Sequence, residues 1–248
     1  MVQANPDIRE KKKLHWMGSS NKDLNSFPVE VQKDIGGAIG AAQFGEKAEG
    51  VKSWKGAGPG VFEIVEPYDG NAYRTVYATA LEKAVYVLHA FQKKSPDGGS
   101  TTDQRDVEAV KQGLKGGESP PQDHLRRKEI AIMAADLENG LPVVHDGSDN
   151  VFADLGLSDA DESEEKIRLA VLVNREIRRR GLRQVAAAKL FESNQAEVSR
   201  LANYKLSGIS ERRLMGFLNA LGQDVEIGVR PARDRRATVT VREIEMAR

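Results

Sequence analysis

The stretch Gln184–Leu201 reads QVAAAKLFESNQAEVSRL, and its spacing predicts two short helices joined by a tight turn. Counted from Gln184, a small residue stands fifth, at Ala188, and apolar residues stand fifteenth and eighteenth, at Val198 and Leu201. The small residue lets the two helices approach closely, and the apolar pair anchors the second helix to a core. This is the packing pattern of a helix-turn-helix unit.

The turn departs from the usual pattern at its ninth position. Glycine is usual there because the backbone needs a positive φ, whereas this chain has Glu192. We expect Glu192 to cost a little stability, and it leaves the geometry of the turn open. An ordinary helical hairpin is the alternative interpretation, since arginine-rich helices also occur on proteins that do not bind nucleic acid.

Further elements are predicted on both sides of this unit. The apolar residues between Glu165 and Arg180 form a broad helical stripe, and a second amphipathic segment runs from Leu214 to Leu221. Alternation from Val225 to Val229 predicts a short strand. We therefore predict a mostly α helix-turn-helix domain with a short β-strand over residues 165–231, followed by an extension at 232–248.

Charge is distributed unevenly along the 248 residues, although its formal sum is zero. Residues 1–132 carry 19 basic and 18 acidic side chains, residues 133–165 carry none and ten, and residues 166–248 carry 18 and nine. The C-terminal segment is thus basic enough to suit contact with a polyanion. The acidic segment follows a region with Gly and Pro, and this composition predicts a linker over 117–164.

Composition excludes several classes of protein. The chain has no cysteine, so neither a disulfide framework nor a thiolate metal site can form. Its four histidines are scattered, which argues against zinc, and no cofactor or metal is expected. The N-terminus has no signal-peptide pattern, and no apolar run approaches the length of a membrane span. We expect a cytoplasmic protein without membrane contact.

Upstream, the sequence predicts an α+β domain over residues 14–116, with helices packed on a small antiparallel sheet, after a basic tail at 1–13. Gly36, Gly37 and Gly40 weaken its main helix, so we expect that helix to depend on packing against the sheet. The predicted elements are a strand at 14–17, a helix from Pro28 to about Gly45, strands at 61–66, 72–79 and 83–92, and a helix at about 102–114.

Basic side chains stand within or beside the predicted strands: Lys52, Lys55, Arg74, Lys93 and Lys94. Such a set can hold RNA phosphates and neutralise charge on a pentacoordinate phosphorus, while a neutralised lysine or an exposed carboxylate assists the 2′-hydroxyl. Lysines at strand ends are also commonly just solvated, so the residues alone leave both interpretations open. Alternation places His89 with Val87 and Phe91, which favours a partly buried histidine over a general base.

Several runs of the N-terminal half carry a family resemblance: LHWMGSSNKDL at 14–24, KSWKG at 52–56, VFEIVE at 61–66, YRTVY at 73–77 and VYVLHAFQKKS at 85–95. Together they resemble the phage-derived HigB-like toxins of the RelE/ParE superfamily. The resemblance implies a small microbial-RNase-like fold, metal-independent cleavage of mRNA on the ribosome, and catalysis by the five basic residues above. The superfamily also contains gyrase poisons that lack RNase activity.

Two runs of the C-terminal half, QAEVSRL at 195–201 and FLNALGQDVEI at 217–227, are similar to the Cro/cI-like helix-turn-helix antitoxins of the HigA type. That resemblance implies a dimer that places its second helix in the major groove at each half-site of a palindromic operator. On that alignment the residues that face bases are Gln195, Ala196, Ser199 and Arg200. The residues that hold phosphates are Gln184, Asn194, Tyr204 and Lys205.

The two resemblances together imply a fused toxin–antitoxin protein. A latent ribosome-associated mRNA endoribonuclease would be held inactive by its own antitoxin half, which would also repress its operon. The expected partners are operator DNA, mRNA on the ribosome and a second copy of the chain, with the halves docked within one chain or swapped between two. The alternative is a DNA-binding repressor whose toxin-like half is an inert interaction domain.

The acidic stretch is then the expected junction of two once-separate genes, with Met133 as a candidate former start codon. Its composition favours a solvated, flexible tether. A sharper hypothesis places some of its ten acids over the five basic residues of the N-terminal half, where they would mimic RNA phosphates.

Overall fold

The computed structural model describes residues 11–54, 59–79, 84–93, 110 and 143–228. Several predicted features lie outside these residues: most of the basic tail, Lys55, Lys94, the helix at 102–114 apart from Val110, the first part of the linker with Met133, and the extension at 232–248. Among the described residues, no helix is long and apolar enough to cross a membrane.

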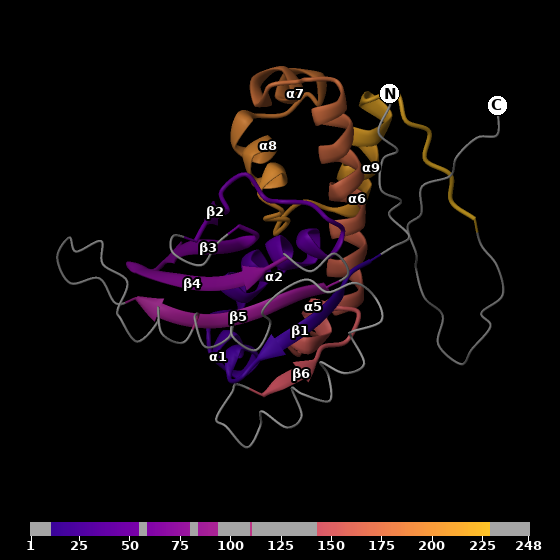
Figure 1. Ribbon diagram of the computed structural model, residues 1–248. Helices are drawn as coiled ribbons and strands as arrows, with labels where there is room; N and C mark the ends of the chain where they lie inside the picture. The colour runs from indigo at the N-terminus through magenta and orange to yellow at the C-terminus, as the bar shows by residue number, and fades with distance from the viewer. Residues whose placement is uncertain (1–10, 55–58, 80–83, 94–109, 111–142, 229–248) are drawn as a thin grey trace.

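A six-stranded sheet in the order β2-β3-β4-β5-β1-β6 forms the lower part of the molecule (Figure 1). Its neighbouring strands pair antiparallel, except that β1 runs parallel to β5. The predicted small antiparallel sheet is thus extended by one parallel pair, because helices separate β1 from the meander and allow a parallel neighbour. The strands are β1 (Lys13–Met17), β2 (Lys52–Ser53), β3 (Val61–Tyr68), β4 (Asn71–Ala78), β5 (Ala84–Lys93) and β6 (Val144–Asp146).

The three-stranded meander predicted from alternation is confirmed as β3, β4 and β5. Asp69 and Gly70 connect the first two strands with φ of 47° and 71°, which is the positive-φ pair of a tight hairpin turn. Between β4 and β5 the register shifts after Val76, so that Leu88 has no partner in the pairing. This bulge reverses which face of the sheet the following residues occupy.

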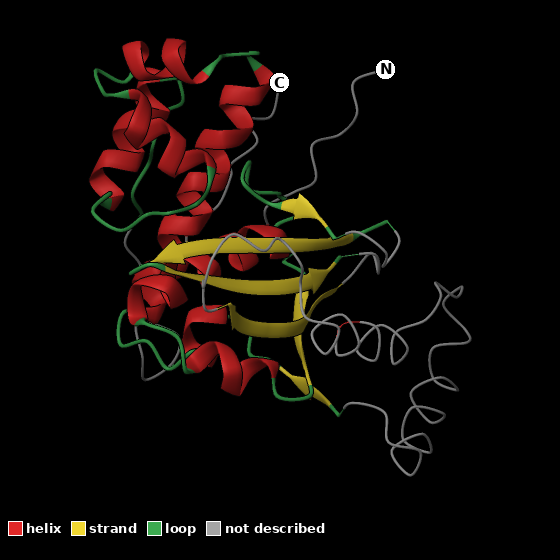
Figure 2. Cartoon of the chain, turned by 90° about the vertical axis from the view of Figure 1, so that its left-hand side faces the viewer, coloured by secondary structure: helices red, strands yellow, loops and turns green. Residues whose placement is uncertain are grey.

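Helices gather at one side of the sheet (Figure 2). Helix α6 runs the length of the C-terminal half, and α7, α8 and α9 pack around its upper part (Figure 1). The prediction of a mostly helical C-terminal region is confirmed, although residues 225–228 do not form the predicted strand. The helices are α1 (Ser20–Asn25), α2 (Val29–Gln43), α5 (Val151–Asp154), α6 (Ala160–Arg179), α7 (Gln184–Leu190), α8 (Gln195–Ala202) and α9 (Glu211–Ala220).

A single apolar core joins the two halves of the chain. Ile35 and Ile39 of α2 belong to the same buried cluster as Ile167 of α6 and Leu201 of α8. Each of these side chains is at most 2% exposed. The halves are therefore packed as one body across a shared core.

The glycines of α2 make this contact possible. A β-carbon on Gly37 would lie 2.2 Å from the carbonyl oxygen of Tyr204, and one on Gly36 would lie 3.0 Å from the ring of Phe152. The expectation that α2 depends on packing is confirmed, but its partners include the C-terminal half as well as the sheet. The three glycines predicted to weaken the helix are thus the positions at which the two halves meet.

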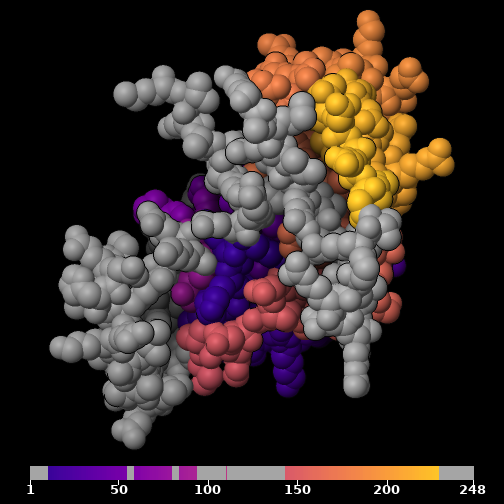
Figure 3. Space-filling view, turned by 90° about the vertical axis from the view of Figure 1, so that its right-hand side faces the viewer, coloured from indigo at the N-terminus to yellow at the C-terminus, as the bar shows by residue number. Residues whose placement is uncertain are grey.

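The acidic stretch is folded from residue 143 onward. Strand β6 pairs antiparallel with β1, and Figure 3 shows this segment lying against the N-terminal strand. Helix α5 follows, and the side chain of Asn150 caps it by accepting hydrogen bonds from the backbone N–H groups of Phe152 and Ala153. The prediction of a tether therefore fails for residues 143–164, which contain β6, α5 and the start of α6.

Candidate nucleic-acid interfaces

Helices α7 and α8 have the packing that the sequence spacing predicts. Ala188, Val198 and Leu201 are buried between the helices and the core. Glu192 adopts φ of 50°, so the turn keeps its left-handed residue although glycine is absent. The helix-turn-helix geometry is therefore formed with a strained glutamate at its turn.

One side of α8 faces solvent. Gln195, Ala196 and Arg200 are exposed, Ser199 is half-buried, and Val198 behind them is buried. The Arg200 guanidinium donates one hydrogen bond to a described residue, from Nη1 to the carbonyl of Ser207 at 3.2 Å. The four residues expected to face bases thus lie on or beside the outward surface of one helix.

The residues expected to hold phosphates have other partners. Asn194 caps α8, since its side-chain oxygen accepts the N–H of Glu197 at 2.8 Å. Gln184 donates from Nε2 to Glu49 at 2.7 Å, and the Lys205 ammonium lies 2.5 Å from Glu66 and 3.8 Å from Asp34. Glu49 therefore contacts Gln184, and Glu66 and Asp34 face Lys205. Gln184 and Lys205 are two of the residues that were expected to hold DNA phosphates.

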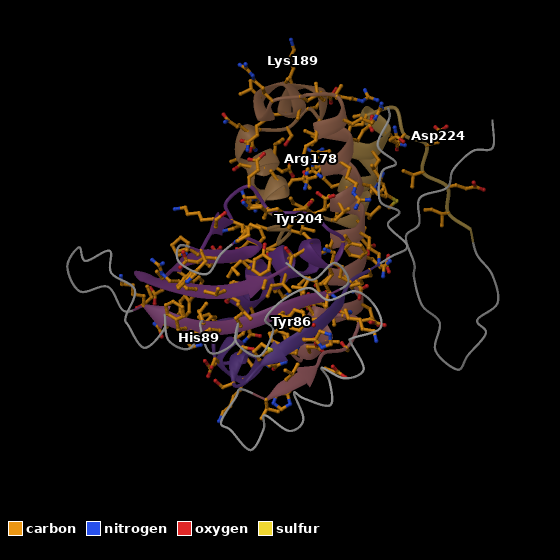
Figure 4. The ribbon with its side chains drawn as sticks, viewed as in Figure 1. Tyr86, His89, Arg178, Lys189, Tyr204 and Asp224 are labelled. Atoms are coloured by element: carbon orange, nitrogen blue, oxygen red, sulfur yellow. The ribbon has the colours of Figure 1, made fainter. Side chains whose placement is uncertain are left out.

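Tyr204 is not a surface residue. It is 1% exposed, has φ of 57°, and lies between the halves in Figure 4. Burial raises the pKa of its hydroxyl above the ordinary value, and the charge of Glu46 acts in the same direction. In this arrangement the Tyr204 side chain is buried and cannot reach a phosphate, contrary to the prediction.

Ion pairs across the junction follow the charge distribution of the sequence. Near the upper end, Glu46 pairs with Arg175 at 2.7 Å and with Arg178. Near the lower end the signs reverse, since Lys11 lies 2.8 Å from Glu164 and Lys33 lies 2.7 Å from Asp159. Acids of the stretch 143–164 therefore meet bases of the N-terminal half, and bases after residue 166 meet its acids.

These contacts bear on the hypothesis of phosphate mimicry. Asp146 lies 2.9 Å from Nδ1 of His15, and the indole N–H of Trp16 donates to Asp154 at 2.9 Å. Together with Asp159 and Glu164, these acids contact β1, α2 and Lys11, and none of those partners is one of the five basic candidates. For these four acids the mimicry hypothesis is wrong.

Three basic candidates share the sheet face that points away from α2. Tyr73 belongs to the core that contains α2, and Arg74 alternates with it, so Arg74 faces the other way. The strand register places Lys52 beside Glu63 and Lys93 beside Ala72, on the same face as Arg74. The structure therefore brings Lys52, Arg74 and Lys93 to one face of the sheet.

Glu63 and His89 also lie on this face, although the sequence did not predict that they would. Glu63 accepts a hydrogen bond from Nη1 of Arg74 at 2.5 Å. His89 pairs with Val76, because the bulge at Leu88 turns it away from Val87, and its ring stacks on Phe91 with centroids 5.1 Å apart. The bulge separates His89 from Val87, whereas its partial burial and its place beside Phe91 agree with the prediction. Cross-strand register is what locates Glu63 on this face.

Figure 4 shows His89 on the sheet and Lys189, near the end of α7, at the top of the helical half. The molecule thus presents one outward recognition helix and, separately, one sheet face that combines a carboxylate, a guanidinium, an imidazole and lysines.

Comparison with known families assigns both regions. Residues 22–115 match the phage-derived protein Gp49-like family, and residues 151–230 match a helix-turn-helix domain. The chain joins a Gp49-like region to a helix-turn-helix region. A solved structure described as an XRE family transcriptional regulator is 46% identical over 36% of this chain and 99% of its own, with a TM-score of 0.32. No curated protein matches the chain.

Both matches begin on described helices. The helix-turn-helix match begins at Val151, the first residue of α5, and so includes part of the acidic stretch. The Gp49-like match begins at Lys22, within α1, after β1. Strands β1 and β6, which pair with each other, therefore lie outside both matches.

Proposed function

We propose that the chain is a fused toxin–antitoxin protein of the HigB–HigA type. Its helix-turn-helix half binds a palindromic operator as a homodimer and represses its own operon. Its Gp49-like half is a latent, metal-independent mRNA endoribonuclease that acts on the ribosome. The observation that carries the DNA-binding part is the solvent-facing side of α8, with Gln195, Ala196 and Arg200 exposed on a helix-turn-helix scaffold.

The chemistry of α8 suits direct readout in the major groove. Glutamine matches the donor and acceptor pair of adenine, and arginine matches the two acceptors of guanine. Gln195 stands at the first turn of α8 and Arg200 in its last turn. A helix placed in the groove through this side would contact several successive base pairs.

The test uses the intact chain with Arg200→Ala and, as control, Arg212→Ala, which removes an exposed arginine from α9. Binding is measured on a duplex selected by the intact protein from a random pool. Arg200→Ala should lose roughly 1–3 kcal/mol of binding free energy and relax the preference at one base pair. Equal weakening on every sequence would make Arg200 a phosphate contact instead.

Support for the ribonuclease comes from the sheet face opposite α2. Glu63 and His89 can exchange protons with the 2′-hydroxyl and the leaving oxygen, and Arg74 can neutralise the developing charge on phosphorus. Lys52 and Lys93 flank these groups and suit the flanking phosphates. This division of roles requires no metal ion.

A second candidate function is a repressor with an inert Gp49-like half. It is favoured by the ion pair of Arg74 with Glu63, which engages the guanidinium. It is also favoured by the described contacts of the C-terminal half, which lie on Lys11, α1, α2, β1, residues 46–50 and Glu66 of β3. The restraint proposed for the ribonuclease must therefore act through these elements, since those contacts do not reach Arg74.

These two candidates are separated by releasing the Gp49-like half. A protease site placed within residues 117–142, together with Glu46→Lys, cuts the chain and removes the ion pairs with Arg175 and Arg178. A ribonuclease should then cut mRNA on ribosomes, and Arg74→Ala should abolish the cut while Lys22→Ala on α1 retains it. A released half that remains folded, as circular dichroism would show, and leaves mRNA intact would support the inert alternative.

A further inference from the structure

Two carboxylates of the N-terminal half bind side chains of the helix-turn-helix half that are expected to hold DNA phosphates. Oε2 of Glu49 accepts a hydrogen bond from Gln184 at 2.7 Å. Oε2 of Glu66 lies 2.5 Å from the Lys205 ammonium. Gln184 begins α7 and Lys205 follows α8, so the two contacts lie at both ends of the helix-turn-helix unit.

The segment that carries Glu49 is fixed against the end of α8. The backbone N–H of Glu49 donates to the carbonyl of Ala202 at 3.3 Å, and that of Gly50 donates to the side chain of Asn203 at 2.5 Å. Glu46, a few residues earlier, pairs with Arg175 at 2.7 Å. The position of Glu49 beside Gln184 is therefore set by backbone contacts as well as by its own hydrogen bond.

These contacts leave negative charge at the edge of the unit. Glu49 is exposed, and its partner Gln184 is neutral. The negative charge of Glu49 is therefore not cancelled. At Lys205, one ammonium faces the carboxylates of both Glu66 and Asp34. A phosphate brought to either position would meet a like charge and would also have to displace an existing partner.

The base-reading side of α8 is not involved in these contacts. Gln195, Ala196 and Arg200 remain exposed while Gln184 and Lys205 are engaged. Contacts to phosphates supply much of the affinity of a DNA-binding protein, and contacts to bases supply its sequence preference. The N-terminal half therefore engages the residues for phosphate contacts and leaves the residues for base contacts exposed.

We propose that the docked N-terminal half weakens the hold of the helix-turn-helix half on the DNA backbone by engaging Gln184 and Lys205 with Glu49 and Glu66. This inference rests on the proposed DNA binding and adds a regulator to it. The docked chain recognises its operator with the same base preference but a lower affinity than a chain in which those acids are neutral. The N-terminal half is thus an intramolecular competitor of DNA phosphate.

The experiment uses the full chain with Glu49→Gln and, separately, Glu66→Gln, on duplex DNA of random sequence over a range of salt concentrations. Glu49→Gln should bind several-fold more tightly at low salt. Glu66→Gln leaves Lys205, among the described residues, only the more distant carboxylate of Asp34, at 3.8 Å, and should steepen the slope of log K against log salt by up to about one. The control is Glu162→Gln, which removes an exposed carboxylate at the far end of α6, where it pairs with Lys166 at 2.7 Å.

The possible results are distinct. Tighter binding by the first two variants but not by Glu162→Gln supports the proposal, whereas an equal gain in all three reflects net charge alone and overturns it. Unchanged or weaker binding by Glu49→Gln also overturns it, and this exposed position decides the question if Glu66→Gln fails to fold. If neither the intact chain nor any variant binds duplex DNA, the proposed DNA binding fails as well.

Discussion

Gly37 has no space for a side chain, because a β-carbon there would lie 2.2 Å from the carbonyl oxygen of Tyr204. Gly37→Ala should therefore lower the free energy of unfolding by about 1–3 kcal/mol, since two backbone segments must move apart. Gly40→Ala in the same helix is the control. Its nearest neighbours would be 3.6 Å away, so it should keep or gain stability through helix propensity, by up to about 1 kcal/mol. Urea denaturation of both variants measures the difference, and equal losses would contradict the assignment.

Glu192 holds a left-handed backbone conformation, with φ of 50°, at the turn between α7 and α8. Glu192→Gly should raise the free energy of unfolding by about 0.5–1 kcal/mol, because relief of strain exceeds the added chain entropy of glycine. Glu192→Ala removes the same side chain but keeps a β-carbon, so it should not reproduce the gain. Thermal unfolding of the three proteins is the measurement, and a gain in Glu192→Ala would point to the carboxylate instead.

The surroundings of some single residues could not be predicted from the sequence. Alternation places His89 with Val87, but the bulge at Leu88 turns His89 to the face of Arg74. Lys205 looks like a surface lysine in the sequence, yet Glu66 and Asp34 face it from another part of the chain. Both outcomes depend on contacts between distant residues, which local periodicity does not encode.

At the scale of elements, α8 depends on Asn194 for its first turn. Asn194→Ala removes the acceptor of the Glu197 N–H and should cost about 0.5–2 kcal/mol of stability. Asn194→Ser retains a capping oxygen and should restore most of that loss. Denaturation by urea compares the two. If serine failed to restore stability, the main role of Asn194 would lie elsewhere than the cap.

The elements differ in how far sequence predicts them. Strands β3 to β5 and helices α2, α6 and α9 follow from period, since each is long enough to show its alternation or apolar stripe. Strand β6 has three residues, all exposed, and it forms because β1, more than 120 residues earlier in the chain, pairs with it. Helix α5 has one turn within an acidic stretch, so charge concealed the apolar pair Val151 and Phe152 that reaches α2.

At the scale of the whole molecule, the charge distribution has a structural counterpart. The acidic stretch meets Lys11 and Lys33, and the basic segment after it meets Glu46 and Glu66. The sequence predicted the two halves and their charges, but it did not show that each half neutralises the other across a shared core. A core of this extent favours cooperative unfolding of the intact chain.

Asp34 makes this junction sensitive to pH. Burial first, and the charge of Glu66 second, raise the pKa of its carboxyl from 3.8 to about 6. The folded state thus prefers the protonated form, so the ionised carboxylate lowers stability above pH 6, and this loss disappears as the pH falls toward the unfolded value. Asp34→Asn should therefore gain on the order of 1–3 kcal/mol at neutral pH and little near pH 4.

Urea denaturation at the two pH values measures this effect. Asp161→Asn, which removes an exposed carboxylate from the first turn of α6, should not show a gain that depends on pH in this way. A constant difference between Asp34→Asn and the parent chain at both pH values would contradict the role assigned to Asp34.

The hydrogen bond from Trp16 to Asp154 gives the molecule an optical reporter of its own junction. The chain has two tryptophans, and Trp16 is 1% exposed with its indole N–H bonded to α5 at 2.9 Å. With Trp54→Phe, the remaining emission comes from Trp16 alone. Separation of the halves would remove the Asp154 acceptor and the β6 neighbour of β1, which should move the fluorescence to longer wavelength, so docking can be followed in real time without an attached dye.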